Sequence, residues 1–548
     1  MNKSEILVFT ATYNEIANIK TLLGEIWANV PNVDILVVDD NSPDGTGKYL
    51  NSISKINPSL HVIHRTHKLG IGSAHQIAMF YALKQKYKYL ITLDADHSHN
   101  PADIPKLIIE LNDADFVIGS RYVEGGSCNY KGYRNYVSRL ANFFAKKLLG
   151  INLHEFTTSF RAFRVSTLNK IDLISIQNHG YSFFMEIIFH LHRANLILKE
   201  SPIHFRDRNA GSSKIPQFEI LYSALKFINL GMMRFFSKNK SIKFKSIENE
   251  CPSCKSIFFV KKFNRDLNLF PIKKNDILGD YKCSSMDHRV KPLLIKCLKC
   301  GLVQAPRAEY PKNLAELYSS VIDHTYLSNT SAKKKTFANA YRYIEPFLEK
   351  PGELLEVGSY CGFFLNYARH QGWSVKGIEP SNWACKYSKK TFNLDVINSS
   401  FDGAMKKLNS HYDLIVSWDV IEHVENPSDF IQSSFLLLKP GGIFAISTID
   451  IDSFFSRLLG EKWPWIMRMH LFYFGSKSLE WMIEAEGFKL IEVRPYRHYA
   501  SLKYAYLKAC SIFPLPIERI AVKLGRLLPD FVIPITLGDV KVYIAKKI

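Results

Sequence analysis

The chain has 548 residues, 47% of them hydrophobic and 13% aromatic, so large cores can form and wholesale disorder is not expected. This length predicts three or four domains. The formal charge of +20 is dispersed along the chain and no nucleic-acid motif accompanies it. The charge therefore favours an anionic membrane surface and phosphate-bearing substrates, and no nucleic-acid partner is expected.

The N-terminus and the hydropathy pattern predict a cytoplasmic protein. Residues 2–5 are polar and precede only a strand-length apolar run, so no signal peptide is expected. No uncharged apolar run approaches the roughly 18 residues that a membrane span needs. The nine cysteines are few for this length, and four of them form two C-x-x-C pairs. That usage favours a reducing compartment and metal ligands over a disulfide scaffold.

Three short apolar runs near the N-terminus each end in polar residues. Residues 6–9 lead into Thr12-Tyr13-Asn14-Glu15, residues 35–38 into Asp39-Asp40, and residues 89–93 into Asp94-Ala95-Asp96. Helical patterns follow the first two runs. The alternation predicts an α/β domain around a parallel sheet, with ligands at the carboxyl ends of the strands.

Asp94 and Asp96 are the most informative pair in this region. In a strand, residues two apart lie on the same face. Two carboxylates at the end of a buried strand suit a hard divalent cation, which can neutralise the diphosphate of a nucleotide-sugar. The alternative is the start of an Asx-rich loop without catalytic meaning.

Six motifs, in order, resemble the inverting glycosyltransferases of family 2, which have the GT-A fold. Within the family, the dolichyl- or polyprenyl-phosphate mannosyltransferases look most similar, over residues 1–235. The motifs are TYNE (12–15), DDNSPDGT (39–46), DADHSH (94–99), GSRY (119–122), RNYVSRLAN (134–142) and DRNAGSSK (207–214).

The resemblance implies a donor site and an acceptor site. The donor residues would be Thr12, Tyr13, Glu15, Asp39, Asp40 and Asp94, with Asp39 reading the nucleobase and Asp96 binding Mg²⁺ or Mn²⁺. An acceptor phosphate would be held by Arg121, Arg134, Ser138, Arg139, Arg208 and Lys214, since arginine pairs two phosphate oxygens at once. Several of these are surface residues instead if the acceptor is not a phosphate.

The acceptor decides whether the first reaction needs a general base. A lipid phosphate is already anionic, whereas a sugar hydroxyl needs a base, for which Glu155 and Glu186 are the candidates. The polyprenyl-phosphate subgroup usually has Asp at the position of Glu155 and Gly at that of Ser159. These two departures leave the acceptor open.

Two apolar stretches with basic residues, 133–149 and 218–236, are expected to be helical. They predict peripheral docking on the inner face of the membrane, or simply packing on the sheet with the basic residues in water. A membrane-embedded partner subunit is left open. Residues 236–248 are polar and basic and are expected to be a linker.

Two cysteine knuckles occupy a segment expected over residues 249–311. Cys251, Cys254, Cys297 and Cys300 supply four thiolates, enough to close a structural tetrahedral zinc site. The alternative is four reduced, buried cysteines.

A second α/β pattern is expected over residues 312–548. Residues 354–363 read as strand, glycine turn and helix start, and Glu379 ends the next strand about 20 residues on, the place of a ribose-binding acid. A dehydrogenase shares those features. The WDVIEHV segment (418–424) and the KPGG turn (439–442) instead resemble class I methyltransferases that use S-adenosylmethionine. The resemblance covers about residues 250–500 and departs at Tyr360, where glycine is common.

By this resemblance the cofactor residues would be Glu356, Gly358, Gly362, Glu379 and Asp419. His423 and His470 are candidate bases toward an acceptor hydroxyl, because an unperturbed histidine titrates near neutrality. The alternative is that both histidines hold loops together.

The sequence thus predicts a Rossmann-like GT-A domain, a zinc-ribbon segment and a Rossmann-like class I methyltransferase domain. The expected function is sugar transfer to a polyprenyl phosphate with methylation of a sugar or lipid-linked intermediate. The alternatives are a surface-polysaccharide glycosyltransferase that acts on sugar hydroxyls, and a second domain that is a non-catalytic binding or scaffold module.

Overall fold

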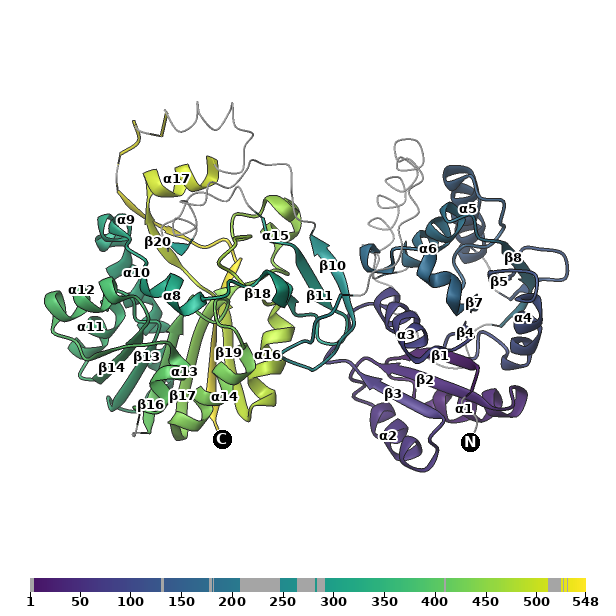
Figure 1. Ribbon diagram of the computed structural model, residues 1–548, viewed down its shortest axis with the longest axis horizontal. Helices are drawn as coiled ribbons and strands as arrows, with labels where there is room; N and C mark the ends of the chain where they lie inside the picture. Colours follow the sequence, from purple (N-terminus) through teal and green to yellow (C-terminus); the bar gives the residue numbers. More distant parts are fainter. Residues whose placement is uncertain are drawn as a thin grey trace. The chain divides into compact units, whose positions relative to one another are not determined.

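The computed structural model describes residues 4–129, 133–176, 180, 182–206, 247–263, 281–282, 291–408, 411–510, 524–525, 527–529 and 531–548. The chain divides into two compact units, one built mainly from residues 1–248 and the other mainly from residues 301–548. Each unit has its own sheet and its own buried cores. Figure 1 labels the elements of both.

The first unit is built on a seven-stranded sheet of order β3-β2-β1-β4-β7-β5-β8. Its strands are β1 (Ile6–Thr12), β2 (Val33–Asp39), β3 (Leu60–His64), β4 (Tyr89–Thr92), β5 (Phe116–Ser120), β7 (Arg161–Arg164) and β8 (Leu198–Pro202). The pairs β1–β2, β1–β4, β2–β3 and β5–β8 are parallel, whereas β7 runs antiparallel to β4 and β5. The sheet is therefore mixed rather than wholly parallel. A pair of short strands, β6 (Ser127–Cys128) and β9 (His204–Phe205), lies outside it.

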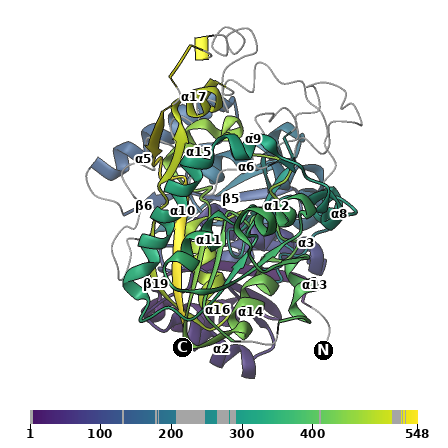
Figure 2. The same ribbon diagram turned by 90° about the vertical axis from the view of Figure 1, so that its left-hand side faces the viewer.

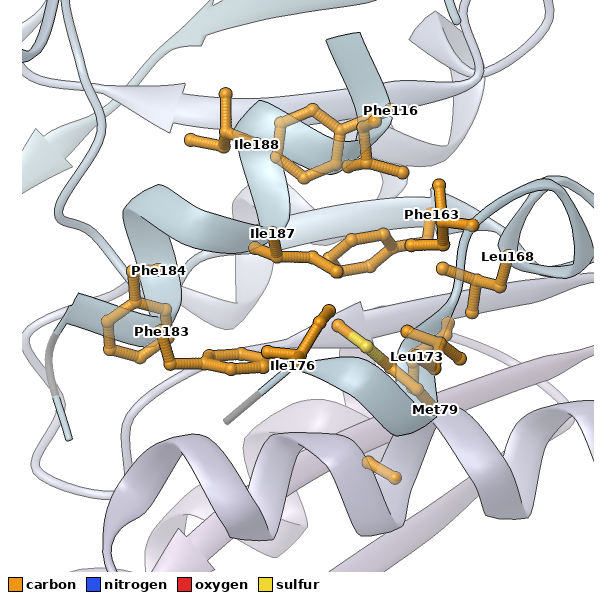
Figure 3. Close-up of a cluster of buried hydrophobic side chains, with 14 of the residues drawn as sticks. Met79, Phe116, Phe163, Leu168, Leu173, Ile176, Phe183, Phe184, Ile187 and Ile188 are labelled. Carbon is orange, nitrogen blue, oxygen red and sulfur yellow. The ribbon is translucent and has the colours of Figure 1, made fainter. Parts of the chain in front are cut away.

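The helices of this unit follow the alternation expected from the sequence. They are α1 (Ile16–Asn29), α2 (Thr46–Ile56), α3 (Ile71–Gln85), α4 (Ile104–Glu110), α5 (Tyr133–Leu149) and α6 (Ser182–Arg193). Buried side chains of α3 and α6 pack with Phe116 and Phe163 of the sheet in one core, which Figure 3 shows around Met79, Phe183 and Ile187. That core fixes the ends of β4 and β5, from which the site loops start.

The second unit has a seven-stranded sheet of order β15-β14-β13-β16-β17-β22-β19. Its strands are β13 (Glu353–Val357), β14 (Ser374–Glu379), β15 (Val396–Asn398), β16 (Tyr412–Trp418), β17 (Leu438–Ile449), β19 (Phe488–Pro495) and β22 (Val540–Lys547). The strands from β15 to β17 are parallel, and β22 runs antiparallel to β17 and β19. Both units are thus α/β folds of the Rossmann-like kind, as the sequence predicts.

The second unit also contains helices, several of which contact its seven-stranded sheet. They are α10 (Thr330–Ile344), α11 (Phe363–His370), α12 (Asn382–Phe392), α13 (Phe401–Met405), α14 (Pro427–Leu437), α15 (Phe454–Leu459), α16 (Ser476–Ala485) and α17 (Leu502–Cys510), with the short α8 (Leu314–Ser319) and α9 (His324–Ser328) before them. Helices α10 and α11 lie side by side (Figures 1 and 2). Strand β20 (His498–Ser501) pairs with β21 (Val532–Ile535) and contacts α10.

Three strands of the knuckle segment, β10 (Phe259–Phe263), β11 (Leu294–Cys297) and β12 (Val303–Gln304), form a small sheet with β18 (Phe472–Tyr473), in the order β10-β11-β12-β18. Stretch 133–149 is helical as predicted. Stretch 218–236 and the proposed linker up to residue 246 lie outside the described residues. Among the residues that the structure describes, no helix is both long and apolar enough to cross a bilayer.

Candidate active sites

The carboxylate of Asp39 lies at the carboxyl end of β2, beside Thr12 at the end of β1. Its Oδ1 accepts hydrogen bonds from the hydroxyls of Thr12 (3.0 Å) and Ser42 (2.5 Å), and His64 Nδ1 lies 3.7 Å from Oδ2. Burial by itself raises the pKa of Asp39, but the nearby His64 and the hydrogen bonds from Ser42 and Thr12 outweigh it and lower the pKa. Asp39 is therefore a buried, ionised acceptor, suited to a group that donates hydrogen bonds.

The turns after β1 and β2 are tied together. The backbone N–H of Glu15 donates to Thr46 Oγ1 at 3.1 Å, and the ammonium of Lys68 lies 3.6 Å from the centre of the Tyr13 ring. Thr12, Tyr13, Glu15 and Asp39 thus belong to one loop cluster at the edge of the sheet, where the sequence predicts the donor.

Asp40 differs from its neighbour Asp39. Its carboxylate pairs with Nε of Arg65, a residue that is only 2% exposed and that also donates to Ser73 Oγ at 2.5 Å. Burial raises the pKa of Asp40, and the Arg65 guanidinium opposes that rise. Asp40 therefore holds Arg65 in place beneath the turn.

Asp94 and Asp96 follow β4, which ends at Thr92. Both lie in the turn beyond the strand, so the alternation of side chains along a strand does not determine how they lie. The Asp94 side chain is 33% exposed, whereas Asp96 is 7% exposed and accepts a hydrogen bond from the backbone N–H of Ser98 at 3.1 Å. The pair offers the oxygen donors that a hard divalent cation prefers.

His99 belongs to this turn, and its role was not foreseen from the sequence. Its Nδ1 accepts the backbone N–H of Asp94 at 3.3 Å, and its ring packs against Phe160 and Phe205. Burial lowers the pKa of His99 to about 4, so the ring is neutral. The DADHSH motif contained this residue, but nothing in its spacing distinguished a supporting histidine from a solvent-exposed one.

Arg121 and Glu155 form a buried ion pair. Glu155 is fully buried and takes two hydrogen bonds from the guanidinium of Arg121, 2.7 Å from Nε and 2.9 Å from Nη2. Arg121 Nη2 also donates to Thr157 Oγ1 at 2.8 Å and lies 3.3 Å from Ser138 Oγ. Burial alone raises the pKa of Glu155, yet Arg121 and Thr157 bring it below its usual value.

The other predicted acceptor residues are only partly brought together. Ser138 accepts the hydroxyl of Tyr122 at 2.8 Å, and the exposed Arg139 lies over the Tyr122 ring, 5.0 Å from its centre. The side chain of Arg134 is not among those described, and Arg208 and Lys214 lie outside the described residues. Glu186 is buried on α6, with His190 3.9 Å away.

The two knuckles bring Cys251, Cys254, Cys297 and Cys300 together. Their four sulfur atoms all lie within 4.8 Å of one another, and none is in a disulfide. The backbone N–H of Lys299 donates to Cys297 Sγ at 3.4 Å. Four convergent thiols are the donor set of a structural zinc site.

In the second unit, Glu379 ends β14 and faces the loop after β13. Its two oxygens accept the backbone N–H groups of Tyr360 (2.9 Å) and Ser381 (2.7 Å). Burial raises the pKa of Glu379 to about 7, although these two hydrogen bonds oppose the rise. Gly358 has φ +77°, and a Cβ there would stand 2.4 Å from Val420 Cγ2, so only glycine keeps this turn open.

A cavity of about 950 Å³ lies over this loop. It is lined by the predicted cofactor residues Glu356, Gly358, Glu379 and Asp419. Oε2 of Glu356 is buried without a hydrogen-bond partner among the described residues, and burial raises the pKa of that carboxyl well above its ordinary value. Asp419 accepts the hydroxyl of Ser447 at 2.7 Å. The Glu356 oxygen without a partner can accept a hydrogen bond from a bound ligand, and Gly358 leaves the turn open to that ligand. Both features fit a cofactor that carries a positive charge and hydroxyl groups.

On the same cavity, Glu422, His423 and His470 each offer one ligand atom, and these three atoms lie within 4.8 Å of one another. Glu422 was not singled out from the sequence, although it directly precedes His423 in the WDVIEHV segment. Burial and the nearby Asp419 raise the pKa of Glu422 to about 8, and burial lowers that of His423 to about 4. The two predicted bases are thus part of a three-residue polar cluster.

A second polar group in the cavity was also missed. Trp418, Tyr496 and His498 have their rings in contact, with centroid distances of 5.8 Å and 4.2 Å. Among the described residues, Trp418 Nε1, Tyr496 Oη and His498 Nε2 are buried without a hydrogen-bond partner. Tyr496 and His498 come from a part of the chain without any motif, so no local signal pointed to them.

Comparison with known proteins bears on both units. Residues 7–172 match the family model described as Glycosyl transferase family 2. Undecaprenyl-phosphate mannosyltransferase of Micrococcus luteus is 40% identical over 211 residues, which are 38% of this chain and 87% of that protein. Polyprenol monophosphomannose synthase of Mycolicibacterium smegmatis is 37% identical over 229 residues, 41% of this chain and 86% of that protein.

The chain belongs to glycosyl transferase family 2. Residues 331–493 also match the family model described as Methyltransferase domain, so a methyltransferase domain follows the glycosyltransferase domain in the same chain. Both parts are enzymes by family, as the sequence predicts.

Two solved structures are similar to part of this chain. They are a SAM-dependent methyltransferase from Archaeoglobus fulgidus (16% identity, 41% of this chain, 100% of that one, TM-score 0.30) and a cyclopropane synthase from Mycobacterium tuberculosis (17% identity, 38% of this chain, 83% of that one, TM-score 0.27).

Proposed function

We propose that the chain is a bifunctional transferase. The first unit transfers a sugar, in an inverting and Mg²⁺- or Mn²⁺-dependent reaction, from a nucleotide-sugar to a polyprenyl phosphate. The second methylates a sugar of a lipid-linked intermediate with S-adenosylmethionine. The names of the two mannosyltransferase relatives support the first assignment. The ionised Asp39 and the turn that carries Asp94 and Asp96 support the donor chemistry.

In the donor site, Asp39 accepts hydrogen bonds from the nucleobase, and the turns that carry Tyr13 and Glu15 enclose it. Asp96, with Asp94, holds the cation. A divalent cation supplies charge stabilisation to the departing nucleoside diphosphate. His99 keeps the Asp94 turn fixed, because its Nδ1 holds the Asp94 backbone.

The Arg121–Glu155 pair favours a phosphate as the acceptor. A general base toward a sugar hydroxyl needs a free carboxylate within reach of the substrate. Glu155 is fully buried, and both of its oxygens are held by Arg121. We therefore assign Glu155 to the positioning of Arg121 and its loop rather than to proton transfer. A lipid phosphate is already anionic, and Arg121, Arg134, Arg139, Arg208, Lys214 and Ser138 are proposed to surround it.

Helix α5 supports docking on a membrane surface from which such a lipid is taken. Ala145 and Leu149 are buried, whereas Tyr136 is 78% exposed and Val137, Leu140, Phe143 and Phe144 are each about half exposed. Arg139 and Lys147 are exposed on the same helix. An apolar face with basic residues beside it binds the interface of an anionic bilayer. We infer a peripheral protein on the cytoplasmic face.

In the second unit, Glu379 is proposed to bind the ribose hydroxyls of the cofactor, while Glu356 and Asp419 face its methionine ammonium. The cofactor supplies an activated methyl group. The remaining cavity is polar at Glu422, His423, His470, Tyr496 and His498. At its mouth Leu458 and Leu537 line the cavity and are 66% and 50% exposed. A hydroxyl-bearing acceptor with an apolar attachment fits this arrangement.

One experiment tests the pair of reactions. The full chain is incubated with a panel of nucleotide-sugars and undecaprenyl phosphate in anionic vesicles, with and without S-adenosylmethionine, and products are identified by mass spectrometry. A sugar-phosphate lipid, and a further gain of one methyl mass with the cofactor, are expected. Equal transfer to a soluble oligosaccharide without lipid phosphate contradicts the acceptor assignment and supports a polysaccharide enzyme.

The zinc site and the scaffold alternative have simpler tests. The purified chain is expected to contain about one zinc per chain, since four thiolates complete a tetrahedral site. Metal-free protein with four titratable knuckle thiols contradicts the site. Failure of the chain to bind S-adenosylmethionine in calorimetry supports a non-catalytic second unit.

A further inference from the structure

The Glu422, His423 and His470 cluster has the composition of a cation site as well as of an acid–base group. Two imidazoles and one carboxylate are a donor set that divalent transition metals favour. The three ligand atoms lie within 4.8 Å of one another, and the cluster lines the methyltransferase cavity. Glu422 and His470 are 1% and 4% exposed.

The contacts behind the two histidines orient their rings. Nδ1 of His423 lies 3.0 Å from the carbonyl oxygen of Met469 and 3.1 Å from the hydroxyl of Tyr318, and Nδ1 of His470 lies 2.8 Å from the carbonyl oxygen of Trp465. A carbonyl oxygen can only accept, and the Tyr318 hydroxyl can accept as well, so all three contacts are satisfied when each Nδ1 carries the hydrogen. In that tautomer each Nε2 has a lone pair. In metal sites, ligating histidines are held in the same way, by donation from the second ring nitrogen to a backbone carbonyl.

The carboxylate has an outer partner too. Thr448 Oγ1 donates to Glu422 Oε2 at 2.9 Å, and the backbone N–H groups of Leu471 and Phe472 hold the Glu422 carbonyl at 2.8 and 3.2 Å. The two segments that carry the cluster are thus pinned together behind it. A buried carboxyl beside two imidazoles, with Asp419 close by, is an environment that a cation stabilises.

We propose that Glu422, His423 and His470 bind one divalent transition-metal ion in the methyltransferase cavity. The role of this ion rests on the proposed methyl transfer. An acceptor hydroxyl bound to the ion loses its proton to solvent. Its oxygen then forms the bond to the methyl carbon, while the carbon–sulfur bond of the sulfonium breaks and S-adenosylhomocysteine leaves. No electron is gained or lost, so no further reactant is needed.

Nickel ion alone is the probe, because imidazole favours it whereas oxygen-rich sites favour magnesium. Untagged full-length chain, brought to one zinc per chain and kept in excess Mg²⁺, is titrated with Ni²⁺ in a calorimeter. His423→Gln and His470→Gln remove one ligand each. His498→Gln, a histidine on the same cavity but outside the cluster, is the matched control.

The wild type and His498→Gln are expected to bind one equivalent of Ni²⁺ at the cluster. His423→Gln and His470→Gln are expected not to bind it. Thr448→Val keeps the side-chain shape and all three ligands, and is expected to weaken that equivalent about 10- to 100-fold through the lost outer hydrogen bond. Circular dichroism and S-adenosylmethionine binding show that each variant is folded.

Equal Ni²⁺ binding by the wild type and both cluster variants overturns the proposal, whether the shared value is zero or reflects surface histidines elsewhere. The titration contains neither cofactor nor acceptor. A failure of methyl transfer therefore leaves its result unchanged, and a failure of nickel binding leaves methyl transfer by acid–base chemistry intact.

Discussion

The two units share an α/β plan, but Asp39 in the first unit and the glutamates that line the cavity of the second have pKa values shifted in opposite directions. In the first, Asp39 is ionised because Thr12 and Ser42 donate hydrogen bonds to it and His64 lies close to it, so its pKa falls. In the second, the hydrogen bonds that Glu356, Glu379 and Glu422 accept do not offset their burial, and burial raises the pKa of all three. The strand-end carboxyl of the first unit is therefore already ionised. The three buried glutamates of the second unit lack, among the described residues, a positively charged partner that would stabilise their ionised form.

This difference matches the ligands proposed for each unit. A nucleotide-sugar brings hydrogen-bond donors on its base and a diphosphate, so it needs a ready acceptor and a cation. S-adenosylmethionine brings a sulfonium and an ammonium, which supply the positive charge that the second cavity lacks. Perturbed carboxyl groups are thus informative about the ligand as well as about the site.

The largest expected effect concerns the pair that holds the first site together. Glu155→Ala leaves the Arg121 guanidinium buried and unpaired, so the unfolding free energy of the first unit should fall by about 3–5 kcal/mol. Hydrogen exchange of the full chain measures it in that unit alone. Asp113→Ala removes an exposed partner of Lys199 and should cost no more than about 1 kcal/mol. A similar small loss for both variants means that the pair does not organise the loop.

The next effect separates the two activities. Asp96→Ala should lower sugar transfer by about 10²–10³-fold, because the leaving diphosphate loses the group that holds its cation. Excess chelator should mimic the substitution. Cofactor binding by the same variant should equal that of the wild type. Near-normal turnover without metal contradicts the role of Asp96.

Glu379→Ala gives the converse result. A buried ribose loses charge-assisted hydrogen bonds, so S-adenosylmethionine binding should weaken by roughly one to two orders of magnitude. Sugar transfer should be retained, which also serves as the folding control. Calorimetry and the transfer assay on one preparation measure both. Unchanged affinity would mean that Glu379 only fixes the Tyr360 and Ser381 turns.

The fold was largely predictable from the sequence, and the geometry of the candidate donor site partly so. Apolar runs and the acids that end them placed the strands and Asp39, because strand ends and ligand edges coincide in such sheets. The Asp94 turn was less predictable, since β4 stops at Thr92 and the loop, not the strand, orients the carboxylates. Tyr496 and His498 could not be found, because only the fold brings them beside Trp418, from about 80 residues away in the chain.

The smallest expected effect is a pH dependence that follows from the comparison. The pKa of Glu379 is about 7 without cofactor, so its carboxylate is mostly ionised at pH 8 and mostly protonated at pH 6. When the carboxyl is protonated, one of its two oxygens no longer accepts a hydrogen bond from a ribose hydroxyl. Cofactor affinity should therefore rise about tenfold from pH 6 to pH 8, the ratio of the ionised fractions. Calorimetry at the two pH values measures it, and Glu379→Gln should remove the tenfold contribution of this carboxyl because its amide does not titrate. Since Asp39 is ionised throughout this range, nucleotide-sugar binding by the first unit should change little over the same two pH units. A parallel rise in both affinities would mean that the contrast between the two sets of carboxyl groups does not govern binding.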